Sequence, residues 1–367
     1  MASGSGTPAA GVAAERREDH QGGSVIELTN DALHFSFPAV HPGAKLHIDF
    51  QRTLRIPDDG RDYPLPPGLG RFPLRHVDDF ARHVPPVWLE HGGVMLPMYQ
   101  AEALWLNFSA PRVADRGTAW PCAIRIATGK VDAVTGRPWV SGLDREPQNY
   151  LVHPGQPWLD GYCVDRGVIR QFVAMPLGEG FTAEEQLTGR GEHGGIQLQV
   201  FPMKREVFER RFPVLPPAPE RAGARALSRE PGAVACAVAA PIELGLAPGG
   251  RMRQEIYIDR FDLSDWDLEQ GSRVFVHLTN AVVWQAIAGQ APPSRPRTAA
   301  DYSRAGLPWF EYYDESRQAV AGSELLRRLR SVLELTAKRG GTALPENASV
   351  PPGRVVRLPE RRVREWC

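Results

Sequence analysis

The chain has 367 residues, enough for two ordinary domains or for one large β-rich domain with a helical extension. Its 43 basic and 43 acidic residues cancel, so the net charge supports neither nucleic acid nor an anionic membrane as a partner. Glycine and proline are abundant, with 36 and 34 residues, and they are spread along the chain without a repeat. This composition favours many short strands joined by tight turns.

The cysteines and the apolar runs indicate in which cellular compartment the protein resides. Cys122, Cys163, Cys236 and Cys367 lie too far apart for zinc-ligand spacing and are too few for a disulfide framework. The N-terminus lacks the pattern of a secretory signal, and apolar runs such as residues 233–242 are far shorter than a membrane span. We therefore expect a soluble cytoplasmic protein that needs no cofactor.

The N-terminal part predicts a tail followed by strands. Residues 1–23 are small, polar and charged, and we expect them to be disordered. Alternating apolar residues predict short strands within residues 25–37 and a longer strand across residues 46–56, where Arg52 breaks the pattern. A proline- and glycine-rich loop follows at residues 63–70 and is stiff enough to line a groove.

Possible metal ligands are densest just after this loop. His76, Asp79 and His83 combine imidazole and carboxylate, which suit zinc or non-haem iron. Their spacing does not bring three ligands together on one helix or strand. A short helix with solvated acids over residues 77–83 is the favoured interpretation.

Residues 93–109 are strongly apolar and aromatic, and their second half predicts a strand. Glu102 stands within this stretch as a charge that can point inward, and it is a candidate catalytic residue. Core packing is the default for Tyr99 and Trp105, although an acid beside aromatic rings also describes a sugar-binding cleft.

The centre of the chain, residues 148–202, holds the longest series of strand and turn signals. Residues 168–175 are apolar on both faces, which predicts a strand covered on both sides. Arg170 interrupts this strand, so we expect either a carboxylate opposite it or an edge position that reaches solvent. Ile196 to Val200 alternate with glutamines, which predicts one buried and one wet face.

Two acidic positions in the centre are further candidates for catalysis. Asp160 precedes a glycine, and this pair favours a tight hairpin turn over a loop acid. Glu185 ends the string Thr-Ala-Glu-Glu, which has the form of a capping box opening a short helix that ends near Gly189. Its neighbour Glu184 cannot share a helix face with it, which weakens a paired-carboxylate mechanism.

Further turn signals divide the rest of the β region. A hairpin is predicted around Thr128-Gly129, between residues 121–127 and 130–134. Residues 212–233 have no periodicity and predict a linker or insertion. A strand pair over residues 235–244 and 252–258 is expected to turn at Pro-Gly-Gly.

The C-terminal part changes character. Helices are predicted over residues 280–288, from Thr298, and over residues 323–340, the last being amphipathic. The run at residues 309–315 is rich in aromatics and acids, and it predicts an aromatic plug or, less favoured, a binding edge for a basic or sugar partner. A basic, proline-interrupted tail ends in Cys367, whose thiol is expected to be solvated.

Together these signals predict a mainly β fold, an antiparallel sandwich or a distorted barrel-like sheet, with a small C-terminal helical part. The expected organisation is a disordered tail at 1–23, a β-rich domain at 24–278 with the insertion at 212–233, a helical extension at 279–342 and an extended tail at 343–367. The strings PWLDG, RQFVAMPLG and GLPWFEYY resemble segments of uncharacterised bacterial proteins, and this resemblance implies no function.

No nucleophile elbow, P-loop, dinucleotide fingerprint, CxxC or HExxH motif occurs in the sequence. The leading hypothesis is a non-enzymatic protein that presents aromatic and proline-rich loops to a protein or small-molecule partner. The alternative is an enzyme acting on a carbohydrate or small polar substrate through carboxylates, with metal assistance from His76, Asp79 and His83. A homo-oligomeric scaffold is a third hypothesis.

Overall fold

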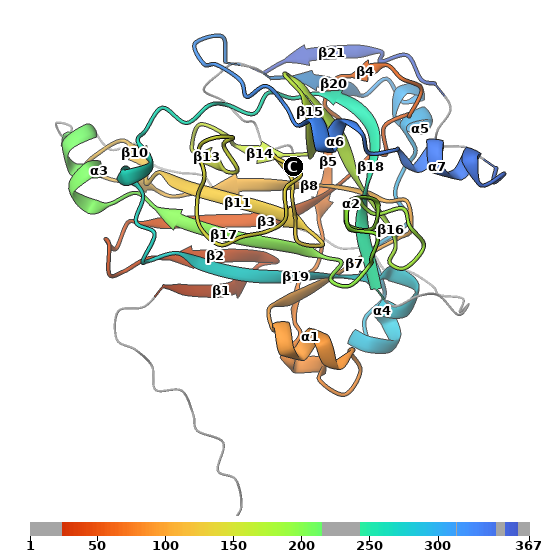
Figure 1. The fold of residues 1–367 in the computed structure, drawn as a ribbon, viewed down its shortest axis with the longest axis horizontal. Coiled ribbons are helices and arrows are strands. Elements are labelled where there is room, and N and C mark those ends of the chain that lie inside the picture. Colours follow the sequence, from red (N-terminus) through yellow and green to blue (C-terminus); the bar gives the residue numbers. More distant parts are fainter. Residues whose placement is uncertain (1–23, 215–242, 313, 343–348, 359–367) are drawn as a thin grey trace, which may run out of the picture.

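The computed structural model describes residues 24–214, 243–312, 314–342 and 349–358 (Figure 1). Most of its strands belong to one hydrogen-bonded sheet of 17 strands, and most pairings are antiparallel. The predicted class, a mainly β fold with a smaller helical part, is confirmed. The expected tail at 1–23, the Cys236 and Cys367 positions and most of the predicted insertion lie outside the described residues.

The sheet consists of two runs of strands joined at one place. The first run is, in spatial order, β1 (Val25–Thr29), β2 (Ala32–Ser36), β3 (Lys45–Thr53), β8 (Ala103–Ser109), β16 (Val168–Pro176) and β18 (Glu243–Arg253). The second is β13 (Leu151–His153), β11 (Cys122–Thr128), β17 (Ile196–Pro202), β19 (Ser272–Asn280) and β7 (Val94–Met98), with β7 parallel to β19. The start of β18 pairs with the end of β19 and connects the two runs.

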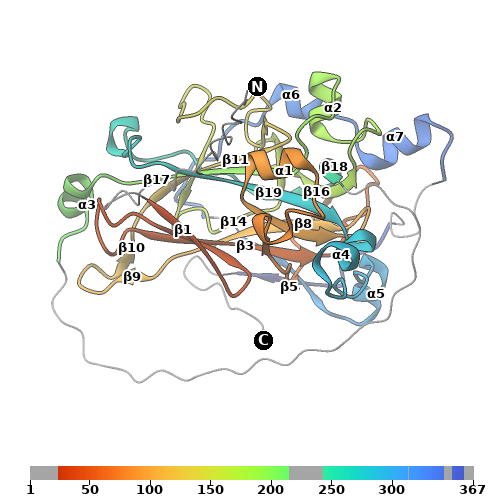
Figure 2. The same cartoon turned by 90° about the horizontal axis from the view of Figure 1, so that it is seen from below.

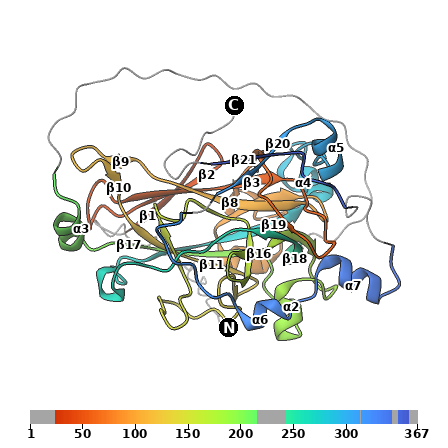
Figure 3. The same ribbon diagram turned by 90° about the horizontal axis from the view of Figure 1, so that it is seen from above.

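The two runs fold over a common core. Figures 2 and 3 show β11, β17 and β19 on one side, β3 and β8 on the other, and β16 with β18 towards one end. Period-two alternation explains this arrangement, since Leu46, Ile48 and Phe50 of β3 are fully buried in the core. Their facing strand β17 contributes Leu198 and Val200 to the same cluster.

Short strands and helices lie around these two runs of strands. They are β4 (Asp62–Tyr63), β5 (Gly68–Arg71), β6 (Arg75–His76), η1 (Asp78–Phe80), α1 (Pro86–His91), β9 (Arg112–Val113), β10 (Thr118–Ala119), β12 (Val131–Asp132), β14 (Trp158–Leu159), β15 (Gly161–Asp165), α2 (Ala183–Thr188), α3 (Arg205–Arg211), η2 (Leu263–Asp265), α4 (Ala281–Ala288), α5 (Ala299–Arg304), β20 (Pro308–Glu311), α6 (Glu324–Arg327), α7 (Val332–Lys338) and β21 (Arg354–Arg357). None of the described helices is long and apolar enough to cross a membrane.

Local chemistry predicted several of these elements correctly. The Thr182–Glu185 capping box opens α2, which ends at a left-handed Gly189. Asn280 caps α4, and Thr298 caps α5 through a second capping box. β11 and β12 form the hairpin expected around Thr128-Gly129.

The aromatic run near residue 309 is a plug, as favoured. Trp309 is fully buried, with its ring centroid 6.1 Å from that of Tyr63 and 6.0 Å from that of Tyr302. Tyr312 lies 4.9 Å from Trp158, which in turn makes an edge contact with Trp105. The aromatic rings therefore pack the C-terminal part onto β8 and β14.

The predicted turn at Pro248-Gly249-Gly250 is wrong, because β18 runs through it without reversing. The register of β16 against β18 shifts between Arg170 and Phe172, so the pairing absorbs an irregularity there. A Cβ atom on Gly250 would overlap the carbonyl oxygen of Pro57. The glycine allows a close approach between backbones here and does not mark a hairpin.

Three further predictions need correction. The helix expected over residues 323–340 is two helices, α6 and α7, because Ser331 forms a new capping box with Glu334. Asp160 does not enter a hairpin, since β14 pairs with β8 while β15 pairs with β16. The expected wet face of β17 is buried, and Gln197 satisfies its amide through the backbone of Lys130 and Gly194.

Candidate functional site

Glu102 is buried and forms an internal ion pair. Its Oε1 accepts a hydrogen bond of 2.8 Å from Nε of Arg52, the residue that broke the pattern of its strand. Its Oε2 accepts from the backbone N–H of Tyr99 at 2.9 Å. Burial raises the pKa of Glu102, and the Arg52 guanidinium opposes that shift. Both charges are used to join β3 to the start of β8.

Asp160 is also buried, but no opposite charge lies beside it in the part of the chain that the structure describes. Its Oδ2 accepts a hydrogen bond of 2.7 Å from Nε2 of Gln254, and it is 2% exposed. Burial raises the pKa of Asp160 to about 7. A carboxyl with such a pKa has the acidity of a general acid, but its burial keeps it away from any substrate.

Arg170 meets the carboxylates that its buried strand required. Its Nη1 lies 3.8 Å from Oδ1 of Asp58, and its Nη2 lies 3.9 Å from Oε1 of Glu334 in α7. Both distances are long for direct hydrogen bonds, so the contact is electrostatic. Arg170 thus attaches the C-terminal helix α7 to β16.

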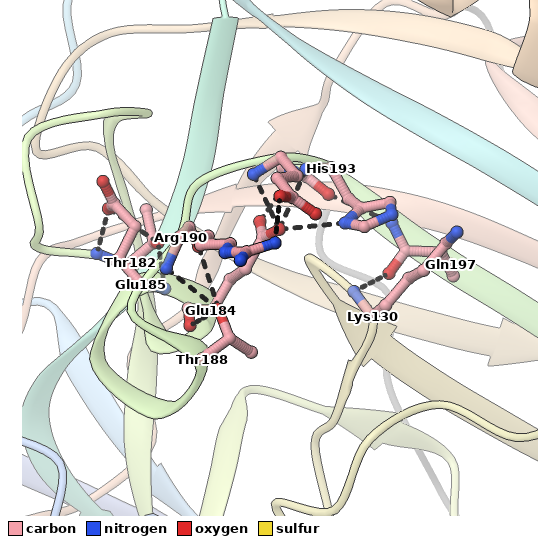
Figure 4. Close-up of polar contacts among 10 residues, drawn as sticks. Lys130, Thr182, Glu184, Glu185, Thr188, Arg190, His193 and Gln197 are labelled. Carbon is pink, nitrogen blue, oxygen red and sulfur yellow. Dashed lines mark hydrogen bonds and ion pairs between the residues drawn. The ribbon is translucent and has the colours of Figure 1, made fainter.

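The Glu184–Glu185 pair organises a loop (Figure 4). Glu185 completes the capping box of α2 with Thr182. Glu184 is 3% exposed and accepts hydrogen bonds from three consecutive backbone N–H groups, those of Glu192, His193 and Gly194, at 2.8–2.9 Å. The ring Nδ1 of His193 lies 3.0 Å from the same carboxylate. A carboxylate held in this way is a structural anchor for the loop that follows α2.

The three metal candidates lie at the surface. His76, Asp79 and His83 are all exposed, and Asp79 belongs to the short 3-10 helix η1 that their spacing favoured. Within the described part of the chain, no three histidine, cysteine, aspartate or glutamate side chains are arranged to hold a metal ion. The structure therefore does not bring these candidates into one site, nor does it unite them with Glu102, Asp160, Arg170 or Glu185.

A pocket opens elsewhere, where five segments of the chain meet. Its lining combines proline and aromatic side chains with two arginines, and we call it the arginine pocket. It is lined by Thr118, Pro121, Val152, Pro154, Gly155, Gln156, Phe212, Tyr257, Ile258, Asp259, Arg260, Phe261 and Arg317. Its space amounts to about 430 Å³ when the part open to solvent is counted, and the centre of a water molecule can move within about 30 Å³ of it. This room suffices for a few water molecules or one small polar group.

One wall of the arginine pocket is a rigid loop at residues 259–261. Oδ2 of Asp259 accepts hydrogen bonds from the hydroxyl of Tyr150 at 2.7 Å and from Nε1 of Trp266 at 3.0 Å. Arg145 donates to the backbone carbonyls of Asp259 and Phe261. Hydrogen bonds from Tyr150, Trp266 and Arg145 therefore hold the loop in place.

This loop presents Arg260 to the outside. The side chain is exposed, and its guanidinium packs on the ring of Phe261 at 5.1 Å. Within residues 24–214, 243–312, 314–342 and 349–358, Arg260 forms no ion pair or side-chain hydrogen bond. Desolvation and the nearby positive charge of Arg317 lower the pKa of Arg260.

Arg317 is the second arginine that lines the pocket. Its Nε lies 2.7 Å from Oδ2 of Asp314, and its guanidinium lies 5.5 Å from the ring of Tyr257. A Cβ atom on Gly155 would overlap Nη1 of Arg317. Glycine at position 155 is therefore what gives this guanidinium its place in the arginine pocket.

Sequence reasoning did not single out Arg260 or Arg317. Each stands in a segment with no motif, and residues 155, 260 and 317 meet only in the folded chain. The Gly-Gln-Pro string at residues 155–157 is one of the turn signals within residues 148–202, and it is a local feature that marks the pocket wall. Comparisons of the chain with family models, curated proteins and solved structures find no match.

Proposed function

We propose that this protein is a non-enzymatic interaction protein, and that its partner places an anionic group in the arginine pocket. The observation that carries the proposal is Arg260, a guanidinium on a rigid loop with no anionic partner of its own among the described residues. Arginine offers a planar fork of donors that matches carboxylates and phosphates. A charge held in place without a counter-ion favours binding one from outside.

The size of the pocket favours one side-chain group of a partner protein as the ligand, and not a complete small-molecule substrate. Typical small-molecule sites enclose roughly 300–1,000 Å³ and bury most of the ligand. Here the volume open to the centre of a water molecule is about 30 Å³. A single side-chain group projecting from a larger partner suits that space.

The lining supports the same proposal. Pro121, Pro154 and Phe261 belong to loops, as expected for a protein that presents proline and aromatic side chains to a partner. The candidate acids Glu102 and Asp160 are buried and have partners within the protein. Neither lines the arginine pocket.

A display library of short random peptides tests the proposal. Selection against the wild-type protein should enrich peptides that contain aspartate, glutamate or a phosphorylated residue and that lose binding to Arg260→Ala. Arg82→Ala is the matched control, because Arg82 is an exposed arginine between η1 and α1, far from the pocket lining. The proposal is overturned if no peptide is enriched, or if the enriched peptides bind Arg260→Ala as well as wild type.

A further inference from the structure

One guanidinium of the arginine pocket forms no ion pair among the described residues. Arg317 is compensated by Asp314 at 2.7 Å. Asp259 is held by Tyr150 and Trp266, and the positive charge of Arg145 acts on it. Arg211, which also faces Arg260, pairs with Asp265 at 2.9 Å. Arg260 forms no ion pair or side-chain hydrogen bond among the described groups that line or face the pocket, and the carboxylates of Asp259 and Asp314 act on it only over longer distances.

We propose that the group recognised in the arginine pocket is a single carboxylate with an apolar neighbour, from an acidic side chain of a partner protein. This inference rests on the proposed function and specifies the chemistry of the partner. One carboxylate carries one negative charge, which matches the single guanidinium that has no ion pair. Its two oxygens accept the parallel donors of the Arg260 guanidinium.

A phosphate group fits this charge pattern less well. A phosphomonoester carries about −1.5 to −2 at pH 7 and presents three acceptor oxygens. Arg260 is the guanidinium left to receive them, while the carboxylates of Asp259 and Asp314 act on it from nearby. The second negative charge of a phosphate would therefore meet repulsion instead of a second free cation.

The rim of the pocket explains the apolar neighbour. Ile258 is 43% exposed, and Pro154 is exposed beside it in the same lining. Phe212 is partly buried and completes the apolar part of the wall. An aliphatic or aromatic group next to the carboxylate would cover these side chains and strengthen the ion pair by excluding water.

Three probes with the same ring separate these possibilities: benzoate, phenyl phosphate and benzamide. Calorimetric or NMR titration of the full chain at constant ionic strength should show that benzoate binds more tightly than phenyl phosphate. Benzamide should show no binding. Arg260→Ala should weaken benzoate about tenfold or more, the usual effect of losing a charge-assisted hydrogen bond. Arg260→Lys should recover part of the affinity, because it keeps the charge but not the planar fork.

The source of the carboxylate is tested with peptides. A short capped peptide with one glutamate between leucines should bind more tightly than benzoate, and its glutamine counterpart should lose that binding. If benzoate binds as tightly as the peptide, the carboxylate comes from a free organic acid and the assignment to a partner protein is wrong.

The failures of the two proposals differ. Tighter binding of phenyl phosphate than of benzoate, dependent on Arg260, overturns the carboxylate assignment and leaves the proposed function standing. Binding of none of the probes, or binding unchanged in Arg260→Ala, overturns both. Gly155→Ala adds a check within the pocket: the new Cβ displaces Arg317, so benzoate affinity should fall by less than in Arg260→Ala.

Discussion

Two arginines of this protein occupy opposite environments. Arg125 of β11 is 2% exposed, lies 3.0 Å from Oδ2 of Asp132, donates to the carbonyls of Val140 and Gly142, and packs on the ring of Trp139. Arg260 is exposed, packs on one ring and forms no ion pair with the described residues. A buried guanidinium must find its partners within the protein, because desolvation is costly. A solvated guanidinium needs no partner within the protein, so it can bind one from outside.

The difference separates charges that hold the fold from a charge available for binding. Glu102, Arg170 and Glu184 belong with Arg125, since each has its charged or hydrogen-bonding partners within the protein. Arg260 can be changed without leaving a buried group unpaired. Stability measurements therefore distinguish the two classes independently of any ligand.

The largest expected effect is at Arg125. Arg125→Met leaves Asp132 buried without its counter-ion, and removing one member of a buried pair typically costs about 3–5 kcal/mol. Urea denaturation should show this loss. Adding Asp132→Asn to the same chain removes the isolated charge and should recover part of the stability. Wild-type stability in the single variant would contradict the assignment of Arg125 to the fold.

Asp160 tests a buried acid that lacks a counter-ion. Because its folded pKa of about 7 lies above the unfolded value of 3.8, folding favours its protonated form. The contribution of Asp160 to stability is full below pH 3.8 and is lost as pH rises towards 7. Each pKa unit corresponds to about 1.4 kcal/mol. Asp160→Asn should therefore be more stable than wild type at pH 8, by up to a few kcal/mol.

The control for Asp160 is the pH dependence itself. The difference in unfolding free energy between Asp160→Asn and wild type should shrink as pH falls from 7 to 4, since wild-type Asp160 becomes neutral. A difference that stays constant across this range would show that the effect of the substitution does not arise from ionisation.

Glu184 should show an intermediate effect. Glu184→Gln keeps the shape but replaces one acceptor oxygen by an amide group that cannot accept hydrogen bonds from the backbone of the loop. Leaving buried donors unsatisfied costs about 1–3 kcal/mol. Thermal unfolding should show this loss, and hydrogen exchange should be faster at Glu192, His193 and Gly194. Glu192→Gln, at an exposed position of the same loop, should change neither.

Short sequence motifs predicted the caps and helices of this chain correctly. They did not predict which residues distant in sequence would pair. The Thr182–Glu185 capping box and the Asn280 cap depend on residues within one turn of helix, so the sequence contains the whole interaction. Arg52 and Glu102 each stood out as irregularities, yet their pairing required β3 to lie against β8 across 50 residues. The pattern shows that a charge is buried without showing which partner it has.

The arginine pocket shows even more clearly that sequence patterns do not reveal which distant segments meet. Its walls come from segments around residues 118, 154, 212, 260 and 317. No period or motif links these positions, and the only local mark, the turn at Gly155, indicates a change of direction without indicating a site. The sequence predicted that loops with proline and aromatic residues would face the outside, but not which of them would meet.

The smallest expected effect on stability is at Arg260. Arg260→Ala removes an exposed guanidinium that has no hydrogen-bond partner among the described residues, and such surface changes usually stay within about 0.5 kcal/mol. Relief of the repulsion from Arg317 and loss of the contact with Phe261 act in opposite directions. Urea denaturation of this variant beside Arg125→Met makes the comparison direct. A loss at Arg260 as large as that at Arg125 would mean that Arg260 holds the fold, and a charge used in that way would not be free to bind a partner.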